Sequence, residues 1–348
     1  MKIFLTGGAV RDELLGRKVR DRDYIILDAD KEHLIKMNYE PVGVGFEVFL
    51  HPKTKDEYTL AVGNNLELEL KRRDLTINSI AQNIESKEYS DPFNGLEDIK
   101  AKVLRHTSES FADDPIRLLR LARFKTQLPE FVIHKDTQQL IKNLSMEENL
   151  FSSIAGERFL LELTKALSLS SPRQFFESLR EWGILDLFFK ELSDLFSISK
   201  KDSWNQVMQT LEKACSISPK FSVRFAALTN ELDQDFTKRF KVDSYTVKLA
   251  QSVYRNKSKI YQASSLQADE ILKLLIGLNA LREGTQFEDV LLCCGAIQNY
   301  DQSFLTLIRD EILKISYENL IEKFSGKKLG IMIEQSRIKK INEIISKK

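Results

Sequence analysis

The hydrophobic pattern of the chain changes near residue 105, and this change limits the fold to two unlike parts. Before residue 105, short apolar or β-branched runs bounded by Gly, Pro or Asp predict strands, and two runs between them predict helices. The predicted strands are residues 2–5, 24–27, 47–50 and 57–62, and the predicted helices are residues 10–15 and 31–37. This alternation indicates a small mixed α/β domain.

After residue 105, apolar residues recur at three- and four-residue spacings, as in Phe159, Leu163 and Leu167. Such spacing is typical of amphipathic helices. The sequence has no fixed-period repeat that would indicate a solenoid. We therefore expect an α+β protein in which a small mixed β-sheet is followed by consecutive all-α modules.

Charge and the rare residue types exclude several classes of protein. The chain has 52 Lys and Arg against 51 Asp and Glu, so any attraction to a polyanion must come from local patches. Three cysteines are too few and too badly spaced for a disulfide framework or a structural zinc site. No apolar run approaches the ~20 residues that span a bilayer, and no secretory leader is recognisable. We expect a cytoplasmic protein without a membrane partner.

The first motif that carries chemistry is Gly7-Gly8 followed by a helical run with Arg11 in its first turn. Glycines after a strand let the backbone approach a ligand closely, and the N–H groups of the new helix point to the same place. Arg11 can add a bidentate contact to a phosphate. The motif predicts a phosphate-binding turn, although tight packing alone gives the same pattern.

The second motif is Asp21-Arg22-Asp23 before an apolar strand. Residues two apart in an extended chain point to the same side, so we expect two carboxylates side by side at the end of the strand. Close like charges repel unless a cation lies between them, and Mg²⁺ is commonly bound by one or two carboxylates plus substrate phosphates. The pair predicts a site for a divalent metal.

Two further motifs are rich in arginine. The third begins a helical pattern at Arg73, Asp74 and Asn78, which we expect to continue through Ile80 and Ala81. The spacing of these polar residues suits a triphosphate and its sugar.

In the fourth motif, Asp114 is the predicted N-cap of a helix that starts at Pro115. Arginines 117, 120 and 123 then fall within one 120° sector of that helix, which indicates an anion-binding face.

The four motifs in this order resemble the class II tRNA nucleotidyltransferases, which include the CCA-adding enzymes, their CC-adding and A-adding relatives, and bacterial poly(A) polymerases. The likeness to the bacterial CCA-adding type is strong over residues 1–125 and thinner beyond. It implies a catalytic head at residues 1–105, a helical neck at 106–150, a helical body at 151–215, and a tRNA-binding body and tail at 216–348. The basic end of the chain, residues 327–348, fits an RNA partner.

The resemblance implies a role for each motif residue. Asp21 and Asp23 would be catalytic and would hold Mg²⁺, with Glu57 as a possible third carboxylate, in a two-metal nucleotidyl transfer. Asp114 and Arg117 would select cytosine and adenine over uracil and guanine without a nucleic-acid template, and Asp113 stands where the family commonly has Glu. The remaining nucleotide-binding positions would be Gly7, Gly8, Arg11, Arg73, Asp74, Asn78, Arg120 and Arg123.

Two departures from the family pattern refine this expectation. In complete CCA-adding enzymes, a long flexible loop joins the strand that ends near Val62 to the third motif, and this loop is linked to the switch from CTP to ATP. Here only residues 63–70 connect the two. We therefore favour the CC-adding subtype, acting before a separate A-adding enzyme, and complete CCA addition is the alternative. The larger relatives also carry a metal-binding His-Asp pair where this chain has Asn230-Glu231, so we expect no phosphohydrolase activity there.

Three other functions compete with this one. A bacterial poly(A) polymerase shares the first three motifs, but the short basic tail and the missing loop favour the tRNA enzyme. A non-catalytic RNA-binding protein derived from such a head would be expected to lose Asp21, Asp23 or Arg73, and all three are present. A nucleotidyltransferase acting on small molecules would leave the long helical part without a purpose.

Overall fold

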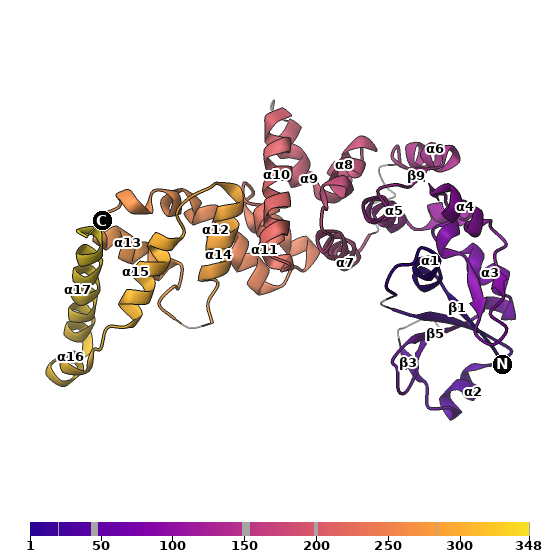
Figure 1. Ribbon diagram of the computed structural model, residues 1–348, viewed down its shortest axis with the longest axis horizontal. Coiled ribbons are helices and arrows are strands. Elements are labelled where there is room, and N and C mark those ends of the chain that lie inside the picture. Colours follow the sequence, from indigo (N-terminus) through magenta and orange to yellow (C-terminus); the bar gives the residue numbers. More distant parts are fainter. Residues whose placement is uncertain (20, 43–47, 148–153, 198–200, 283, 348) are drawn as a thin grey trace. The chain divides into compact units, whose positions relative to one another are not determined.

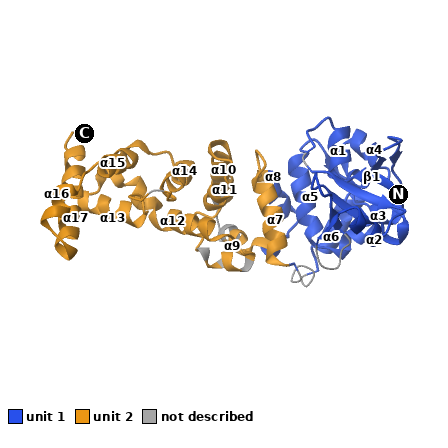
Figure 2. Cartoon of the chain, turned by 90° about the horizontal axis from the view of Figure 1, so that it is seen from below, with its two compact units in different colours: residues 1–154, 174–187 blue, residues 155–173, 188–348 orange. Residues whose placement is uncertain are grey.

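The computed structural model describes residues 1–19, 21–42, 48–147, 154–197, 201–282 and 284–347 (Figure 1). The chain divides into two compact units (Figure 2). Unit 1 contains residues 1–154 and 174–187, and unit 2 contains residues 155–173 and 188–348. Three parts of the sequence-based expectation lie outside the described residues. They are Glu47 at the start of a predicted strand, the predicted domain boundary between residues 150 and 151, and Lys348.

Unit 1 is built on one mixed sheet. Its strands follow the order β3-β4-β5-β2-β1-β6-β7, and β2 and β5 are its one parallel pair among the described strands. The strands are β1 (Lys2–Thr6), β2 (Asp23–Leu27), β3 (Glu40–Val42), β4 (Val48–Leu50), β5 (Glu57–Leu60), β6 (Ala81–Asn83) and β7 (Tyr89–Ser90). A parallel pair aligns the first residues of its two strands, and this matters for the site below.

Both faces of the sheet are covered, as alternate residues of β2 show. Ile25 packs with Leu70 and Ala81, whereas Ile26 packs with Leu34 and its neighbours on the opposite face. The helices of unit 1 are α1 (Gly8–Leu14), α2 (Lys31–Lys36), α3 (Leu66–Lys71), α4 (Gly95–Ala101), α5 (Ile116–Gln127), α6 (Lys135–Leu144) and, after its first residue, α8 (Arg173–Glu181). The 3₁₀ turns are η1 (Val62–Asn64), η2 (Thr76–Asn78) and η3 (Glu109–Asp113), and β8 (Val103–Leu104) pairs with β9 (Val132–Ile133).

The predicted α+β class is confirmed, with a mixed sheet first and helices after it. The predicted strands at 2–5 and 24–27 and both early helices are present within one or two residues of their expected ends. The strand expected at 57–62 ends at Leu60, because η1 follows with Gly63 at φ 58°. This early end makes room for α3.

One predicted helix is wrong. The run from Arg73 to Ala81 does not continue as a helix, because α3 ends at Lys71 and Ala81 lies in β6. Tertiary hydrogen bonds replace the helical ones: the N–H of Thr76 donates to the carbonyl of Arg105, and the N–H of Thr107 donates to that of Asp74. The pattern of apolar residues alone did not reveal these long-range partners.

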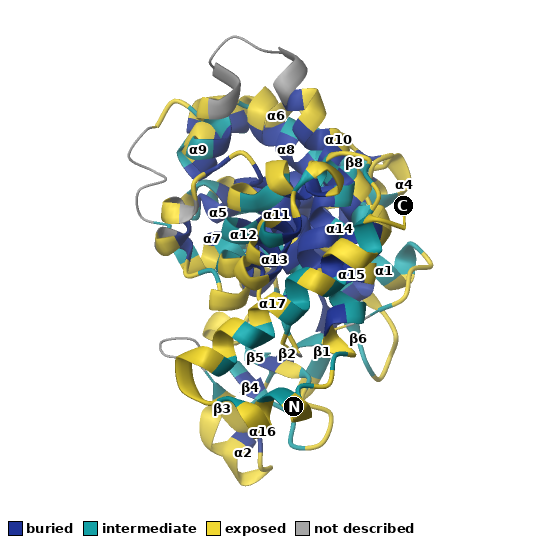
Figure 3. Ribbon diagram, turned by 90° about the vertical axis from the view of Figure 1, so that its left-hand side faces the viewer, coloured by how far each residue is buried: buried dark blue, intermediate teal, exposed yellow. Residues whose placement is uncertain are grey.

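Unit 2 is helical. Its elements are α7 (Gly156–Leu167), α9 (Leu185–Ser197, whose first three residues belong to unit 1), α10 (Lys201–Ile217), α11 (Phe221–Leu228), α12 (Ser244–Tyr261), α13 (Ala268–Gly277), α14 (Phe287–Ile297), α15 (Ser303–Leu313), α16 (Glu318–Lys323), α17 (Gly326–Ile345), η5 (Gln234–Phe240) and η6 (Ala263–Ser265). Helices α10, α11 and α14 pack together, and buried alanines at 214, 227 and 296 allow their close approach. Figure 3 shows much of α14 in the buried colour.

The alanine contact gives the first prediction. We expect Ala227→Leu to lower the free energy of unfolding by about 1–3 kcal/mol, because added side-chain volume at a filled crossing forces its neighbours apart. Urea unfolding followed by circular dichroism measures the change. Ala101→Leu, at an exposed position on α4, is the control and should unfold like the wild type. An unchanged midpoint for Ala227→Leu would show that the crossing has spare room.

Candidate active site

The first motif forms the turn between β1 and α1. Gly7 has φ 71°, a backbone conformation that glycine adopts without strain. A Cβ atom on Gly7 would lie 2.7 Å from Nη1 of Arg73 and 3.4 Å from Oδ2 of Asp23. On Gly8, a Cβ would lie no closer than 3.4 Å to any side chain, that of Arg11. Gly7 is therefore the position that must lack a side chain for Asp23 and Arg73 to approach the turn.

Two carboxylates share one edge of the sheet. Asp23 is the first residue of β2, and the parallel register places it opposite Glu57, the first residue of β5. On the other side of β2, Asp23 pairs with Thr6 at the end of β1. Asp21 is exposed and precedes the strand. Of the expected pair, Asp23 thus lies in the strand and Asp21 in the segment before it. Glu57 lies beside Asp23.

This set of donors fits a hard divalent cation that shares its ligands with substrate. Within the described ranges, no group of three His, Cys, Asp or Glu side chains is close enough to hold a metal by itself. Mg²⁺ commonly uses one or two protein carboxylates and completes its coordination with water and phosphate oxygens. The oxygens of Asp21 and Asp23 therefore suit Mg²⁺ better than a cation that requires a full protein cage.

Arg73 lies close to Asp23 at the β1–α1 turn. Burial lowers the pKa of its guanidinium, and the charges of Asp23, Glu69 and Asp74 oppose that shift. Among the described residues, neither Nε of Arg73 nor Oε2 of Glu69 has a hydrogen-bond partner, although both atoms are buried. An unpaired buried polar group costs about 1–3 kcal/mol, so an anionic ligand that accepts from Nε would remove a real penalty.

Asp74 and Asn78 lie in a buried network. Oδ2 of Asp74 accepts from Nε of Arg120 at 2.7 Å, and its Oδ1 accepts from the Asn78 amide at 2.9 Å and from the Leu75 N–H at 2.8 Å. Nη1 of Arg11 donates to Oδ1 of Asn78 at 2.7 Å. Burial raises the pKa of Asp74, but Arg120 and these hydrogen bonds outweigh it and hold the pKa well below its ordinary value. Asp74 and Asn78 thus orient two arginines.

Three guanidinium groups surround the ring of Phe124. Those of Arg11, Arg120 and Arg123 lie 5.1, 5.8 and 4.3 Å from the ring centroid. Cation–π contacts of this kind contribute about 0.5–2 kcal/mol each. Asp12 accepts from Nε of Arg11 at 2.9 Å and balances one of the three charges. The result is a positively charged cluster on the side of α5 that adjoins α1.

Arg117 is not part of this cluster. Its Nη1 donates to the carbonyl of Ser110, and its Nη2 donates to the carbonyl of Arg72 at 2.6 Å. Helix α5 begins at Ile116, one residue later than expected, and Oδ1 of Asp114 accepts from the Ile116 N–H at 3.4 Å. Asp113 is the last residue of η3. The three arginines expected on one face of α5 therefore lie in two places. Arg120 and Arg123 lie at the Phe124 ring, and Arg117 bonds to the backbone at Ser110 and Arg72.

Sequence reasoning missed Phe124 and Glu69. Phe124 is not among the expected site residues, but Arg120 lies four residues before it, a spacing that brings two helical side chains together. Glu69 pairs with Arg72 at 2.7 Å and adds negative charge beside Arg73. It stands three and four residues before these arginines, so the same spacing rule could have identified it.

In unit 2, the ammonium group of Lys257 lies at the Asn230-Glu231 position. Nζ of Lys257 donates to the carbonyl of Asn230 at 2.7 Å, to its Oδ1 at 3.0 Å and to Oε1 of Glu231 at 2.5 Å. An ammonium group thus occupies the space among these oxygens. In α11, which precedes this position, every residue after Phe221 is buried, as expected for a helix that serves as scaffold.

The Asp74 network gives the second prediction. We expect Asp74→Asn to lower the free energy of unfolding at pH 7 by about 2 kcal/mol, because Arg120 loses its charged acceptor. A depressed pKa stabilises the fold above the unfolded-state pKa of about 3.9, and this contribution is lost as pH falls toward the folded-state pKa. The deficit of the variant should therefore be constant from pH 8 to 5 and shrink below about pH 4. Urea unfolding at each pH measures it.

The control for that series is Glu97→Gln, whose carboxylate is 73% exposed. It should show no deficit at neutral pH. A deficit for Asp74→Asn that is the same at pH 3 as at pH 7 would contradict the charge argument.

Comparisons with known proteins agree with this geometry. Residues 46–105 match the model of the "Poly A polymerase head domain", and residues 130–196 match that of the "Probable RNA and SrmB- binding site of polymerase A". The chain is 34% identical over 373 aligned positions to the CCA-adding enzyme of Coxiella burnetii, strain RSA 493, covering 99% of this chain and 96% of the relative. It is 35% identical over 346 positions to the multifunctional CCA protein of Psychromonas ingrahamii, covering 85% and 84%.

Solved structures share the fold. The CCA-adding enzyme of Thermotoga maritima complexed with tRNA has a TM-score of 0.73 at 22% identity, covering 99% of this chain and 90% of the other. A CCA-adding enzyme with CTP has a TM-score of 0.73 at 22% identity, covering 98% and 86%. In the part of the chain that the structure describes, none of the helices is both long and apolar enough to cross a bilayer.

The sequence identity extends over nearly the whole length of a curated relative, and the four motifs of the sequence all lie in unit 1. This chain belongs to the class II tRNA nucleotidyltransferases of the bacterial CCA-adding type.

Proposed function

We propose that this enzyme adds two cytidine residues from CTP to the 3′ end of tRNA without a nucleic-acid template, and that a separate A-adding enzyme completes the terminus. The observation that carries the CC-adding assignment is the short connection between β5 and Arg72. This connection consists of η1 and α3, with no long loop between them. In relatives that add all three residues, a long flexible loop at this place is linked to the change from CTP to ATP.

Helix α3 leaves the connection no spare length. Oδ1 of Asn65 accepts from the Leu68 N–H at 3.1 Å and caps its first turn, and Leu70 is fully buried near its end. The alignment with the Coxiella burnetii enzyme also runs over 373 positions, more than the 348 residues of this chain. That relative therefore contains segments that this chain lacks.

We propose Asp21 and Asp23 as the catalytic carboxylates and as ligands of Mg²⁺, with Glu57 as a further carboxylate beside Asp23. Magnesium bound there, in a two-metal arrangement, would lower the pKa of the tRNA 3′-hydroxyl and neutralise the departing pyrophosphate. Asp23 is held in place by its two strand neighbours, and Gly7, which has no side chain, lets Arg73 lie beside Asp23 at the turn. Strand placement fixes the carboxylate before substrate binds.

The arginines supply the triphosphate site in this proposal. Arg73, with a buried donor available, lies against Asp23, and the cluster of Arg11, Arg120 and Arg123 adds positive charge from α1 and α5. Gly7 and Gly8 line the approach. We assign Asp74 and Asn78 to orienting these arginines, because their polar atoms already bond within the protein. Preorganised charges of this kind stabilise developing negative charge without reorganisation.

Base selection would fall to Asp114 and Arg117. A carboxylate accepts from the exocyclic amine of cytosine, and a guanidinium donates to the neighbouring ring nitrogen, whereas uracil presents the opposite pattern. Two backbone carbonyls hold Arg117 in one orientation. One of them belongs to Arg72, so the base-selecting residue is tied directly to the segment that carries Arg73.

The tRNA would contact residues beyond the head. We propose residues 1–105 as the catalytic head, 106–150 as the neck, 151–215 as the body and 216–348 as the tRNA-binding body and tail of a cytoplasmic enzyme. The Lys257 ammonium among the oxygens of Asn230 and Glu231 supports the loss of phosphohydrolase activity in that last part.

A second candidate is complete CCA addition. Its support is that the relatives of nearly full length are named CCA-adding enzymes, and that CCA-adding enzymes of the same fold have been solved with CTP and with ATP. The two candidates differ only in the last residue added.

The products distinguish them, and this is the third prediction. Incubated with Mg²⁺ and tRNA that lacks its 3′ end, the protein should add two residues with CTP alone and no third when ATP is also present. Sizing of end-labelled products on a denaturing gel measures this. Addition of a third residue with ATP would establish the complete CCA-adding activity instead, and long adenosine tails would indicate a poly(A) polymerase.

The fourth prediction concerns the carboxylates. Asp23→Asn should lower the turnover number for cytidine addition by roughly a thousandfold or more, because the amide is a poor ligand for Mg²⁺. Glu57→Gln should have a smaller effect. Asp28→Asn is the matched control, since Asp28 follows the far end of β2 and is 45% exposed. Wild-type turnover by Asp23→Asn, or equal losses for Asp23→Asn and Asp28→Asn, would remove the metal assignment.

A further inference from the structure

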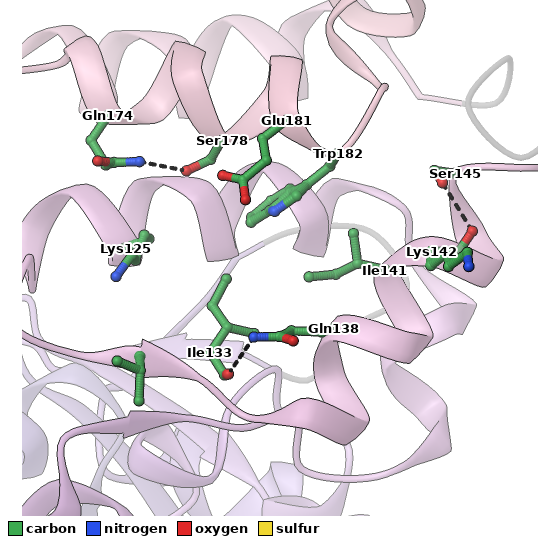
Figure 4. A pocket seen from close by; sticks show the side chains of 11 residues that line it. Lys125, Ile133, Gln138, Ile141, Lys142, Ser145, Gln174, Ser178, Glu181 and Trp182 are labelled. Atoms are coloured by element: carbon green, nitrogen blue, oxygen red, sulfur yellow. Dashed lines mark hydrogen bonds between the residues drawn. The ribbon is translucent and has the colours of Figure 1, made fainter.

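Unit 1 contains a cavity of about 450 Å³ that none of the motif residues lines. Figure 4 shows Glu181 and Trp182 projecting from the end of α8 toward Ile133 and Gln138 of the β9 and α6 region, with Lys142 on α6. This volume is within the range of pockets that enclose small ligands. The cavity is therefore large enough for a single nucleobase and its sugar.

The polar groups of the cavity fall into two sets. The first set already bonds within the protein: Nζ of Lys125 donates to the carbonyl of Phe131, Nε2 of Gln138 donates to that of Ile133, and Nε2 of Gln174 donates to Oγ of Ser178. These bonds hold the walls of the cavity together. They leave the groups of the first set less capacity to bind an incoming charged group.

The second set consists of Lys142 and Glu181, which are exposed, and Trp182, which is half-buried. Over the described parts of the chain, the Lys142 ammonium, the Glu181 carboxylate and the Trp182 indole N–H have no hydrogen-bond or ion-pair partner within the protein. They offer one cation, one anion that accepts hydrogen bonds, and one flat aromatic surface. A ligand that uses all three must present negative charge, a donor group and a planar ring.

The backbone that carries Trp182 is fixed before any ligand binds. Trp182 directly follows α8, and the next residue, Gly183, has φ 69°. The Gly183 N–H donates to the carbonyl of Arg180 at 3.0 Å, and the Ile184 N–H donates to that of Leu179 at 2.9 Å, which is the Schellman pattern of a helix C-terminus. Leu179 and Ile184 are both buried. The backbone beneath the indole is thus held by the helix end, which lowers the entropy lost on binding.

We propose that this cavity binds one unpaired nucleobase of an RNA strand, with the base stacked on Trp182, its exocyclic amine donating to Glu181, and an adjacent phosphate paired with Lys142. This inference rests on the proposed action on tRNA. A free phosphate is a poor fit because the Glu181 carboxylate repels it. Uracil, which lacks an amino group, would bind less well than cytosine or adenine. Most of the lining residues lie within the segment that matches the RNA-binding model, residues 130–196.

The fifth prediction tests the stacking directly. The chain has two tryptophans, and Trp204 is buried in unit 2, so Trp204→Phe leaves Trp182 as the single fluorescent indole. Stacking of a base should quench its emission when oligo(C) or oligo(A) is added, and oligo(U) should quench it less. In direct binding measurements, Trp182→Ala should bind oligo(C) about tenfold more weakly, and Trp182→Phe should retain most of the affinity.

Charge variants test the other two contacts. Glu181→Gln should narrow the difference between oligo(C) and oligo(U), because an amide can also donate to the uracil carbonyl. Lys142→Gln should reduce the slope of log affinity against log salt by about 0.7, the value for one phosphate contact on a single strand. Lys100→Gln, at an exposed position on α4, is the control and should leave the slope unchanged.

Cytidine addition to tRNA by the wild type is measured in parallel. Absence of quenching together with wild-type binding by Trp182→Ala and Trp182→Phe would overturn the cavity assignment, and would be expected if the cavity takes a protein segment instead. If addition proceeds in that case, the proposed function stands without the cavity. If no addition occurs, the proposed function fails whatever the fluorescence shows.

Discussion

The hydrogen bonds of Asp74 are the interaction on which the arrangement of unit 1 depends. This single carboxylate accepts from Arg120 on α5, and it holds Asn78, which in turn accepts from Arg11 on α1. Three segments that are far apart in the sequence are thereby tied together at one point. Without a negative charge there, the guanidinium groups around Phe124 would repel one another in a poorly solvated place. Asp74 therefore keeps these guanidinium groups close together.

The parallel pairing of β2 and β5 provides the second fixed element. Because the two strands start at the same level, Asp23 and Glu57 stand side by side although 33 intervening residues include two antiparallel strands. Antiparallel pairing would have placed the first residue of one strand beside the last residue of the other. Gly7 then brings the β1–α1 turn and Arg73 against Asp23. Negative and positive groups are thus adjacent before substrate arrives, which suits a ligand made of a cation and phosphates.

The sequence predicted the elements whose signal is local and missed those that depend on distant partners. The strands near residues 2–5 and 24–27 follow from short apolar runs between turn residues, and the structure has them. The helix expected from Arg73 to Ala81 failed, because Thr76 bonds to Arg105 and Ala81 pairs with β1, contacts that no local pattern encodes. The grouping of Asp23 with Arg73 could be inferred from motif order and resemblance. The division of labour among the arginines could not, because α5 alone does not show that Arg117 turns toward Ser110 while Arg120 turns toward Asp74.

Helix α3 connects the β2–β5 edge of the sheet to the segment that carries the arginines. It lies between β5, which carries Glu57, and Arg72, whose carbonyl accepts from Arg117. Leu70 anchors the helix in the core, and the Arg72–Glu69 pair secures its end, so the position of Arg73 relative to Asp23 is set by packing. A long flexible loop in the same place would leave this end of the site free to adopt more than one arrangement, as a change of nucleotide requires. A connection made of a capped helix that Leu70 anchors in the core stabilises one arrangement, and one arrangement suits an enzyme that adds the same nucleotide each time.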